Sequence, residues 1–263
     1  FSIDMYEFSD DENVNFFARE IARKLCSKNK QNAMIMCVGA MGSGKSYTMV
    51  ELARLISIYI AERLGGKSTD YFTIEDHVGI MVMDEIAQVY EHMDNHHHQI
   101  YIIDDAGATF NSRRFSSDNN IAQNDRIQVM RPHSNCVIFT TPQKSLLDKV
   151  VRNLVSYMIF MKEPLFEIEM TTCDIRKIEV DLVSTKETVY RKYLQNHRGD
   201  KFKLHMFHKP PQVWCDQYDA RRAVAEKKLA EKSRETVERA NEVRQPKVKQ
   251  SDLYKQHIRN FNS

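Results

Sequence analysis

Glycine is scarce in this sequence, and the few glycines are concentrated. Only 8 of the 263 residues are glycine, and three of them lie between Gly39 and Gly44. The five cysteines form no CxxC pair, which argues against a disulfide scaffold or a zinc framework and favours reduced thiols in a cytosol. We therefore expect a cytoplasmic protein.

Long apolar runs are also missing. The longest, AMIMCVGAM and VSYMIFM, fall well short of the roughly 18–20 residues that span a bilayer. The first residues are acidic and polar, unlike a signal peptide, which is basic and then apolar. We expect no transmembrane segment, and the length indicates one large domain or a domain with a small appendage.

Short apolar runs alternate with amphipathic segments over residues 33–161, and this pattern predicts the fold. Strands are expected at 33–38, 100–103, 136–141 and 156–161, and the stretch KSTDYFTIED is a candidate for another short strand. A helix should open the chain, with Ser9 as its N-cap and Glu12 at the capping-box spacing. We predict an α/β fold with a mostly parallel central sheet and helices on both faces.

The pattern changes after Pro164. The stretches LFEIEMTTCD and IRKIEVDLVS alternate with period 2, which predicts antiparallel strands at the sheet edge, and 202–207 is a further candidate strand. Residues 219–243 read as a charged, exposed helix. We therefore divide the chain into an N-terminal helix packing on the core (1–32), a core of alternating strands and helices (33–163), an antiparallel extension of that core (164–215) and a charged helical tail (216–263).

The tail is basic. From Asp219 onward there are twelve Lys and Arg residues against seven Asp and Glu residues, a balance of +5 within a chain of net charge +2. A basic tail can contact nucleic acid or a recruiting protein. A solvated helix of mixed charge is the alternative, since acids interleave the basic residues throughout.

The stretch GAMGSGKS, from Gly39 to Ser46, matches the P-loop pattern GxxxxGK[ST]. Glycines allow backbone N–H groups to curl around phosphate oxygens, the lysine reaches the β- and γ-phosphates, and the serine hydroxyl ligates Mg²⁺. The loop follows an expected strand and opens an expected helix, whose N-terminus favours anions. We expect it to bind ATP and Mg²⁺ through Gly39, Ala40, Met41, Gly42, Ser43, Gly44, Lys45, Ser46 and Tyr47.

Two acids end the next strong strand, in IIDDAG. A buried acid is costly without a compensating charge, which Mg²⁺ would supply, so Asp104 is the candidate that holds the metal through water. Asp105 would then polarise the attacking water. The alternative is a pair of loop carboxylates that cap Ser or Thr groups.

A polar strand tip follows in VIFTTPQ. Gln143 is the candidate that senses the γ-phosphate or holds the lytic water, and Thr141 is its neighbour and rival; a turn formed by TPQ is the structural alternative. The triplet His96–His98 lacks ligand spacing and is expected to be a polar loop rather than a metal site.

Together, GAMGSGKS, IIDDAG and RPHSNCVIFTTPQ resemble the FtsK/HerA-like division of P-loop motor ATPases, over about residues 10–163. The resemblance implies a ring, usually a hexamer, in which Arg131 reaches the neighbouring subunit's nucleotide. Arg113, Arg114 and Arg152 are rivals for that role. Asp105 in place of Glu and the proline before Gln143 depart from the family pattern, and a Zot-like branch shares the compact layout.

Three functions are compatible with these motifs, and the resemblance favours the first. The first is ATP-driven translocation of double-stranded DNA through a ring, with residues 111–119 and the basic tail as DNA contacts. The second is a morphogenesis or secretion ATPase acting on protein or virion components. The third is a nucleotide-dependent switch or a small-molecule kinase.

Overall fold

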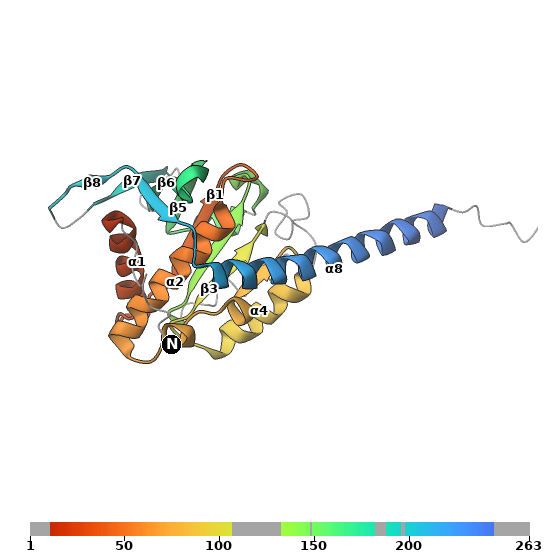
Figure 1. Cartoon of the computed structure of the whole chain (residues 1–263), viewed down its shortest axis with the longest axis horizontal. Helices are drawn as coiled ribbons and strands as arrows, with labels where there is room; N and C mark the ends of the chain where they lie inside the picture. The colour runs from red at the N-terminus through yellow and green to blue at the C-terminus, as the bar shows by residue number, and fades with distance from the viewer. Residues whose placement is uncertain (1–10, 107–132, 148, 182–187, 196–197, 245–263) are drawn as a thin grey trace, which may run out of the picture. The chain divides into compact units, whose positions relative to one another are not determined.

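The structure is a computed structural model that describes residues 11–106, 133–147, 149–181, 188–195 and 198–244. One sheet organises it, in the strand order β2-β3-β4-β1-β5-β6-β7-β8, with β9 paired to β6 (Figure 1). The strands are β1 (Ala33–Val38), β2 (Val78–Ile80), β3 (Ile100–Asp104), β4 (Cys136–Thr141), β5 (Tyr157–Leu165), β6 (Met170–Asp181), β7 (Thr188–Gln195), β8 (Lys201–Phe202) and β9 (His205–His208).

The sheet has a parallel half and an antiparallel half. Strands β2, β3, β4, β1 and β5 pair in parallel, whereas the pairings of β6 with β5, β7 and β9, and of β7 with β8, are antiparallel. This confirms the predicted α/β fold, including its antiparallel edge. The carboxyl ends of β1, β3 and β4 therefore meet at one edge, where such sheets bind ligands.

Helices cover both faces of the parallel half, which makes its strands continuously apolar. The helices are α1 (Glu12–Leu25), α2 (Lys45–Leu64), α3 (Ile74–His77), α4 (Met83–Asn95), α7 (Lys149–Leu154) and α8 (Gln212–Arg244), with 3₁₀ turns η1 (Ser68–Asp70), η4 (Lys144–Leu146) and η5 (Phe166–Ile168). Strand β1 alternates between two cores: Ile35 joins the cluster that holds α1 and α2, whereas Met34 and Met36 join the cluster that holds α4 and α7.

Three local predictions are wrong. Residues 67–76 hold η1 and the start of α3, because Thr73 caps α3 by accepting the N–H of Asp76, and the short strand β2 comes only after it. Helix α1 begins at Glu12 with Asp11 as its N-cap, and Ser9 lies outside the described residues. The two expected edge strands between 165 and 184 are replaced by η5 and one twelve-residue strand, β6.

The charged C-terminal helix is longer and less exposed than expected. It begins at Gln212, and its first turns bury Cys215, Tyr218 and Ala225. The chain divides into two compact units, Phe1–Ala225 and Glu226–Ser263. The three buried residues of α8 belong to the first unit. Across the described ranges, no helix is both long and apolar enough to cross a membrane.

Candidate nucleotide-binding site

The P-loop connects β1 to α2 through a turn that only glycine fits well. Gly42 and Gly44 have φ values of 76° and 79°, in the left-handed region that glycine adopts freely. A Cβ on Gly39 would lie 2.6 Å from the Cβ of Met161. The loop thus turns tightly against β5 and delivers Lys45 and Ser46 to the first turn of α2.

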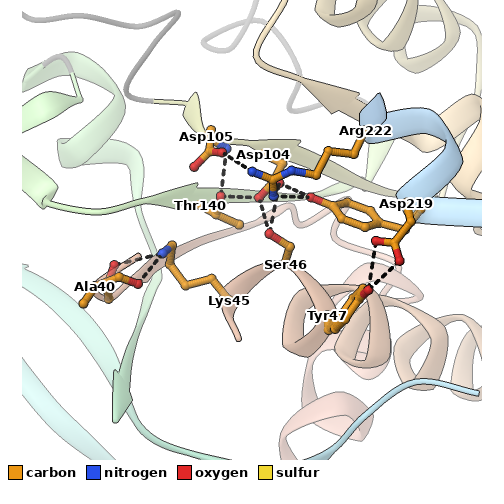
Figure 2. Close-up of polar contacts among 11 residues, drawn as sticks. Ala40, Lys45, Ser46, Tyr47, Asp104, Asp105, Thr140, Asp219 and Arg222 are labelled. Carbon is orange, nitrogen blue, oxygen red and sulfur yellow. Dashed lines mark hydrogen bonds and ion pairs between the residues drawn. The ribbon is translucent and has the colours of Figure 1, made fainter. Parts of the chain in front are cut away.

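The Lys45 side chain crosses the loop. Its ammonium donates hydrogen bonds to the carbonyl oxygens of Gly39, at 2.9 Å, and Ala40, at 2.8 Å, and the residue is only 7% exposed (Figure 2). These are charge-assisted bonds, and a phosphate oxygen is a stronger partner for the same ammonium than a neutral carbonyl.

Asp104 is the centre of the acidic side of the site. It ends β3, is fully buried, and accepts hydrogen bonds from the Ser46 hydroxyl at 3.2 and 3.0 Å. The Thr140 hydroxyl, from the neighbouring strand β4, donates to Oδ1 of the same carboxylate at 2.5 Å. A hydroxyl and a carboxylate at this separation are hard oxygen ligands of the kind that Mg²⁺ prefers, so the residues fit the metal.

Asp105 follows at the point where the chain leaves the strand. Its φ is 50°, a conformation that aspartate adopts more readily than most residues. Its backbone N–H donates to the Thr140 hydroxyl at 2.9 Å, so one threonine fixes both acids. The Asp105 side chain is 30% exposed, which leaves it able to meet water.

The first turns of helix α8 bring two further side chains to the acids, Tyr218 and Arg222, and Figure 2 labels Arg222 beside them. The buried Tyr218 hydroxyl donates to Asp104, and the Arg222 guanidinium lies 4.0 Å from Asp104 and 3.6 Å from Asp105. Asp219, which follows Tyr218 in the chain, accepts a hydrogen bond of 2.8 Å from the hydroxyl of Tyr47 on α2. Helix α8 is therefore part of this site.

Both phenols remain protonated donors. Burial raises the pKa of Tyr218 well above its ordinary value, and the charge and hydrogen bond of Asp104 raise it further, against a lowering contribution from a hydrogen bond with Ser46. Burial also raises the pKa of Tyr47, together with its hydrogen bond to Asp219. At neutral pH each hydroxyl thus presents a proton to a carboxylate.

Sequence reasoning found part of this arrangement. The structure brings Lys45, Ser46, Asp104 and Asp105 together as expected. Thr140, which the sequence did not single out, contacts both acids. The hydroxyl of Thr141, the rival of Gln143, donates to the backbone carbonyl of Gln143. Tyr218, Asp219 and Arg222 were missed, although a tyrosine and an arginine four positions apart share one helix face.

Other candidates lie apart from the acids or outside the described ranges. The Gln143 side chain is exposed, and within the described residues no hydrogen bond joins it to either acid. Met41 is 89% exposed, and Arg152 is half-buried on α7. Arg113, Arg114 and Arg131 are not among the described residues. No group of three or more metal-binding side chains occurs in the part of the chain that the structure describes, His96–His98 included.

A cavity of about 240 Å³ opens beside the P-loop. Its walls come from the loop and the first turn of α2 on one side, and from the β5–β6 connection and the end of β9 on the other. The lining residues are Gly42, Gly44, Tyr47, Thr48, Pro164, Glu169, Met170, Thr171, His208 and Lys209. The cavity is thus continuous with the phosphate-binding loop.

Comparison with known proteins identifies the family. The model of the family "Novel STAND NTPase 3" matches residues 16–198, and no curated protein matches the chain. Among solved structures, the N-terminal domain of zonular occludens toxin from Neisseria meningitidis is 16% identical, with 65% of this chain and 99% of that one covered at a TM-score of 0.40.

The genome packaging NTPase B204 from Sulfolobus turreted icosahedral virus 2 is 13% identical, with 63% of this chain and 98% of that one covered at a TM-score of 0.35. Because both TM-scores lie below 0.5, the assignment depends on the family match, which spans more than half of the chain and includes both the P-loop and the two acids. The chain therefore belongs to the Novel STAND NTPase 3 family, which confirms the P-loop NTPase expected from its sequence.

Proposed function

We propose that this protein is a Mg²⁺-dependent ATP hydrolase that uses the site between α2 and β3. The observation that carries the proposal is the Ser46 hydroxyl on the buried Asp104 carboxylate, next to a P-loop whose lysine is already aimed across the loop. Ser46 would hold Mg²⁺ directly and Asp104 would hold it through water, and the ion would neutralise phosphate charge.

The remaining residues have separate tasks. Backbone N–H groups of residues 39–46 and the N-terminus of α2 would bind the phosphates, with Lys45 moving from the loop carbonyls to the phosphate oxygens. Asp105 would accept a proton from the attacking water, and its partial exposure and the backbone hydrogen bond to Thr140 support this role. The cavity beside Tyr47 and Thr48 would take the nucleoside.

The work coupled to hydrolysis is, in this proposal, the movement of double-stranded DNA through a homo-oligomeric ring, most simply a hexamer. Support comes from the resemblance to FtsK/HerA-like motors and from the tail balance of +5. Arg131 of one subunit would complete the nucleotide site of the next, and phosphate contacts would make DNA binding independent of sequence and sensitive to salt.

The direct test measures phosphate release from ATP with and without double-stranded DNA at low salt. We expect hydrolysis that requires Mg²⁺, rises with DNA, loses the DNA effect at high salt and disappears in Lys45→Ala. Sedimentation of the wild type and of Arg131→Ala with Mg²⁺ and ATP tests the ring. If DNA neither binds to the protein nor stimulates hydrolysis, the translocation proposal is wrong and the ATP hydrolase proposal still stands.

A nucleotide-dependent switch is a second candidate, and one observation favours it. Tyr218 and Arg222 contact the same acids that would serve the metal, so binding at the site would change the contacts of α8. A switch would hydrolyse ATP slowly without DNA and would change the exposure of α8 between nucleotide states, whereas a motor requires stimulation by its track.

A further inference from the structure

The Tyr218 hydroxyl lies where a metal shell would form. It donates to Asp104 Oδ2, the oxygen that also receives the shorter hydrogen bond from the Ser46 hydroxyl, at 3.0 Å. The hydroxyl of Tyr218 is also within hydrogen-bonding reach of Ser46. A magnesium ion held by Ser46 and, through water, by Asp104 requires this same space between the two side chains.

Arg222 supplies positive charge at the same place. Its guanidinium lies 4.0 Å from Asp104 and 3.6 Å from Asp105. Two adjacent carboxylates, one fully buried, need a neighbouring cation. Arg222 and the Tyr218 hydroxyl therefore compensate the negative charge of the two acids, as a divalent ion and its bound water would.

The start of α8 is held against the site by contacts away from the acids. Trp214 stacks on Phe72 with ring centroids 5.5 Å apart and an interplanar angle of 2°. Arg221 forms an ion pair of 2.9 Å with the buried Glu85. Neither contact involves a P-loop residue. The position of Tyr218 therefore depends on how the start of α8 packs on the rest of the protein.

We propose that Tyr218, Asp219 and Arg222 form a latch that closes the metal site, and that binding of Mg²⁺ with a nucleoside triphosphate displaces this part of α8. The inference rests on the proposed function, because it takes Asp104 and Ser46 as the metal-holding pair. It adds that the closed form binds the metal–nucleotide complex weakly and that metal, rather than nucleotide alone, opens it.

The opposite role makes the opposite prediction. If Tyr218 and Arg222 instead positioned the nucleotide, their removal would weaken binding of the metal–nucleotide complex. For a latch, removal strengthens that binding, because the contact that must be broken is already gone.

The experiment uses the full chain freed of nucleotide and metal, and a non-hydrolysable ATP analogue with either MgCl₂ or EDTA. Titration calorimetry gives the affinity. The single tryptophan, Trp214, reports on α8 by its emission. The variants are Tyr218→Phe, which keeps the buried ring, and Arg222→Gln. The matched control is Tyr71→Phe, whose hydroxyl donates to the Gly65 carbonyl and has no part in the latch.

We expect Trp214 emission to move to longer wavelength with the magnesium complex but not with analogue and EDTA. Tyr218→Phe and Arg222→Gln should each bind the magnesium complex about tenfold more tightly, as expected when a hydrogen bond or ion pair to a buried charge no longer has to be broken. Their affinity in EDTA and the affinity of Tyr71→Phe should match wild type.

Equal or weaker binding by both variants, or emission that ignores the magnesium complex, would overturn the latch while leaving nucleotide binding in place. Failure of wild type and of both variants to bind, or binding that survives Lys45→Ala, would instead overturn the proposed function. Circular dichroism of each variant confirms that it is folded, and Arg222→Gln keeps the test decisive if Tyr218→Phe is unstable.

Discussion

The two parts of helix α8 differ both in burial and in charge, although they belong to one helix. In Gln212–Ala225, 4 of the 14 residues are charged, and Cys215, Tyr218 and Ala225 are buried at spacings of three and seven positions. In Glu226–Arg244, 11 of the 19 residues are charged, and the apolar side chains of Leu229 and Val237 are 38% and 59% exposed. The part of the helix that packs is therefore the part with the lower charge density and with apolar residues at a helical spacing.

The largest expected effect separates the two parts with a matched pair of substitutions. Ala225 is fully buried and Ala230 is exposed. Ala225→Lys should lower the free energy of unfolding by roughly 2–4 kcal/mol, because it places a charge in an apolar contact. Ala230→Lys should change it by less than about 0.5 kcal/mol. Chemical denaturation measures both, and equal effects would contradict the division of the helix.

A second substitution tests the link between the buried part and the acids. Asp104→Asn keeps the shape of the side chain but removes the charge that would hold the metal through water. We expect hydrolysis at fixed Mg²⁺ to fall roughly 10- to 100-fold, with a higher Mg²⁺ concentration needed for half the maximal rate. Phosphate release across a Mg²⁺ titration measures this, and an unchanged Mg²⁺ dependence would exclude Asp104 as the metal-holding acid.

Low pH should destabilise the segment around His77 and Phe72, on which the first part of α8 packs. His77 lies against Phe72, on which Trp214 stacks, and its Nε2–H donates a hydrogen bond of 2.7 Å to the side-chain oxygen of Gln99. Burial lowers the pKa of His77 from 6.5 to about 4; the neighbouring His92 lowers it as well, against Gln99 and Asp76, which raise it. The unfolded chain therefore binds the proton first as pH falls.

The stability that neutral His77 provides is fully present above pH 6.5 and is lost as pH falls towards about 4. Between pH 7 and pH 5 the loss should be about 2 kcal/mol. Thermal unfolding of wild type and His77→Gln at the two pH values isolates this share, since the variant should lose less stability on acidification. An equal loss in both proteins would assign the pH dependence to other groups.

The smallest expected effect concerns the hydrogen bond between Tyr47 and Asp219, at 2.8 Å on the partly exposed edge of the contact. Tyr47→Phe should reduce the free energy of unfolding by about 0.5–1 kcal/mol, because solvent replaces part of the lost bond. Val237→Ala, in the exposed part of α8, serves as the comparison and should be silent. A larger effect for Val237→Ala would mean that this part of the helix also packs.

The sequence predicted the features whose signal is local. The P-loop pattern, the strand that ends in Asp104 and Asp105, and the order of strands and helices all depend on short runs of residues. Glycines at Gly42 and Gly44 are needed because the backbone there takes positive φ values. Each of these could be derived from spacing and backbone chemistry alone.

The rest depends on contacts between distant segments. Tyr218 and Asp104 are 114 positions apart, and Thr140 and Asp104 are 36 apart. Nothing in the charged stretch YDARRAVAEKK marks its first turns as buried, since the deciding partners lie on α2, β3 and the Phe72 segment. The contact of Thr140 with Asp104 depends likewise on the register between β4 and β3, because successive side chains of a strand point to opposite faces of the sheet.

The central claim is that the first turns of α8 close the metal site and are displaced when the metal–nucleotide complex binds. Hydrogen exchange of backbone amides, measured with and without Mg²⁺ and a non-hydrolysable ATP analogue, tests it most directly. We predict that the complex slows exchange at residues 39–46 and speeds exchange at residues 212–225, with no change at 226–244. Slower or unchanged exchange at 212–225, with protection of 39–46, would contradict the claim.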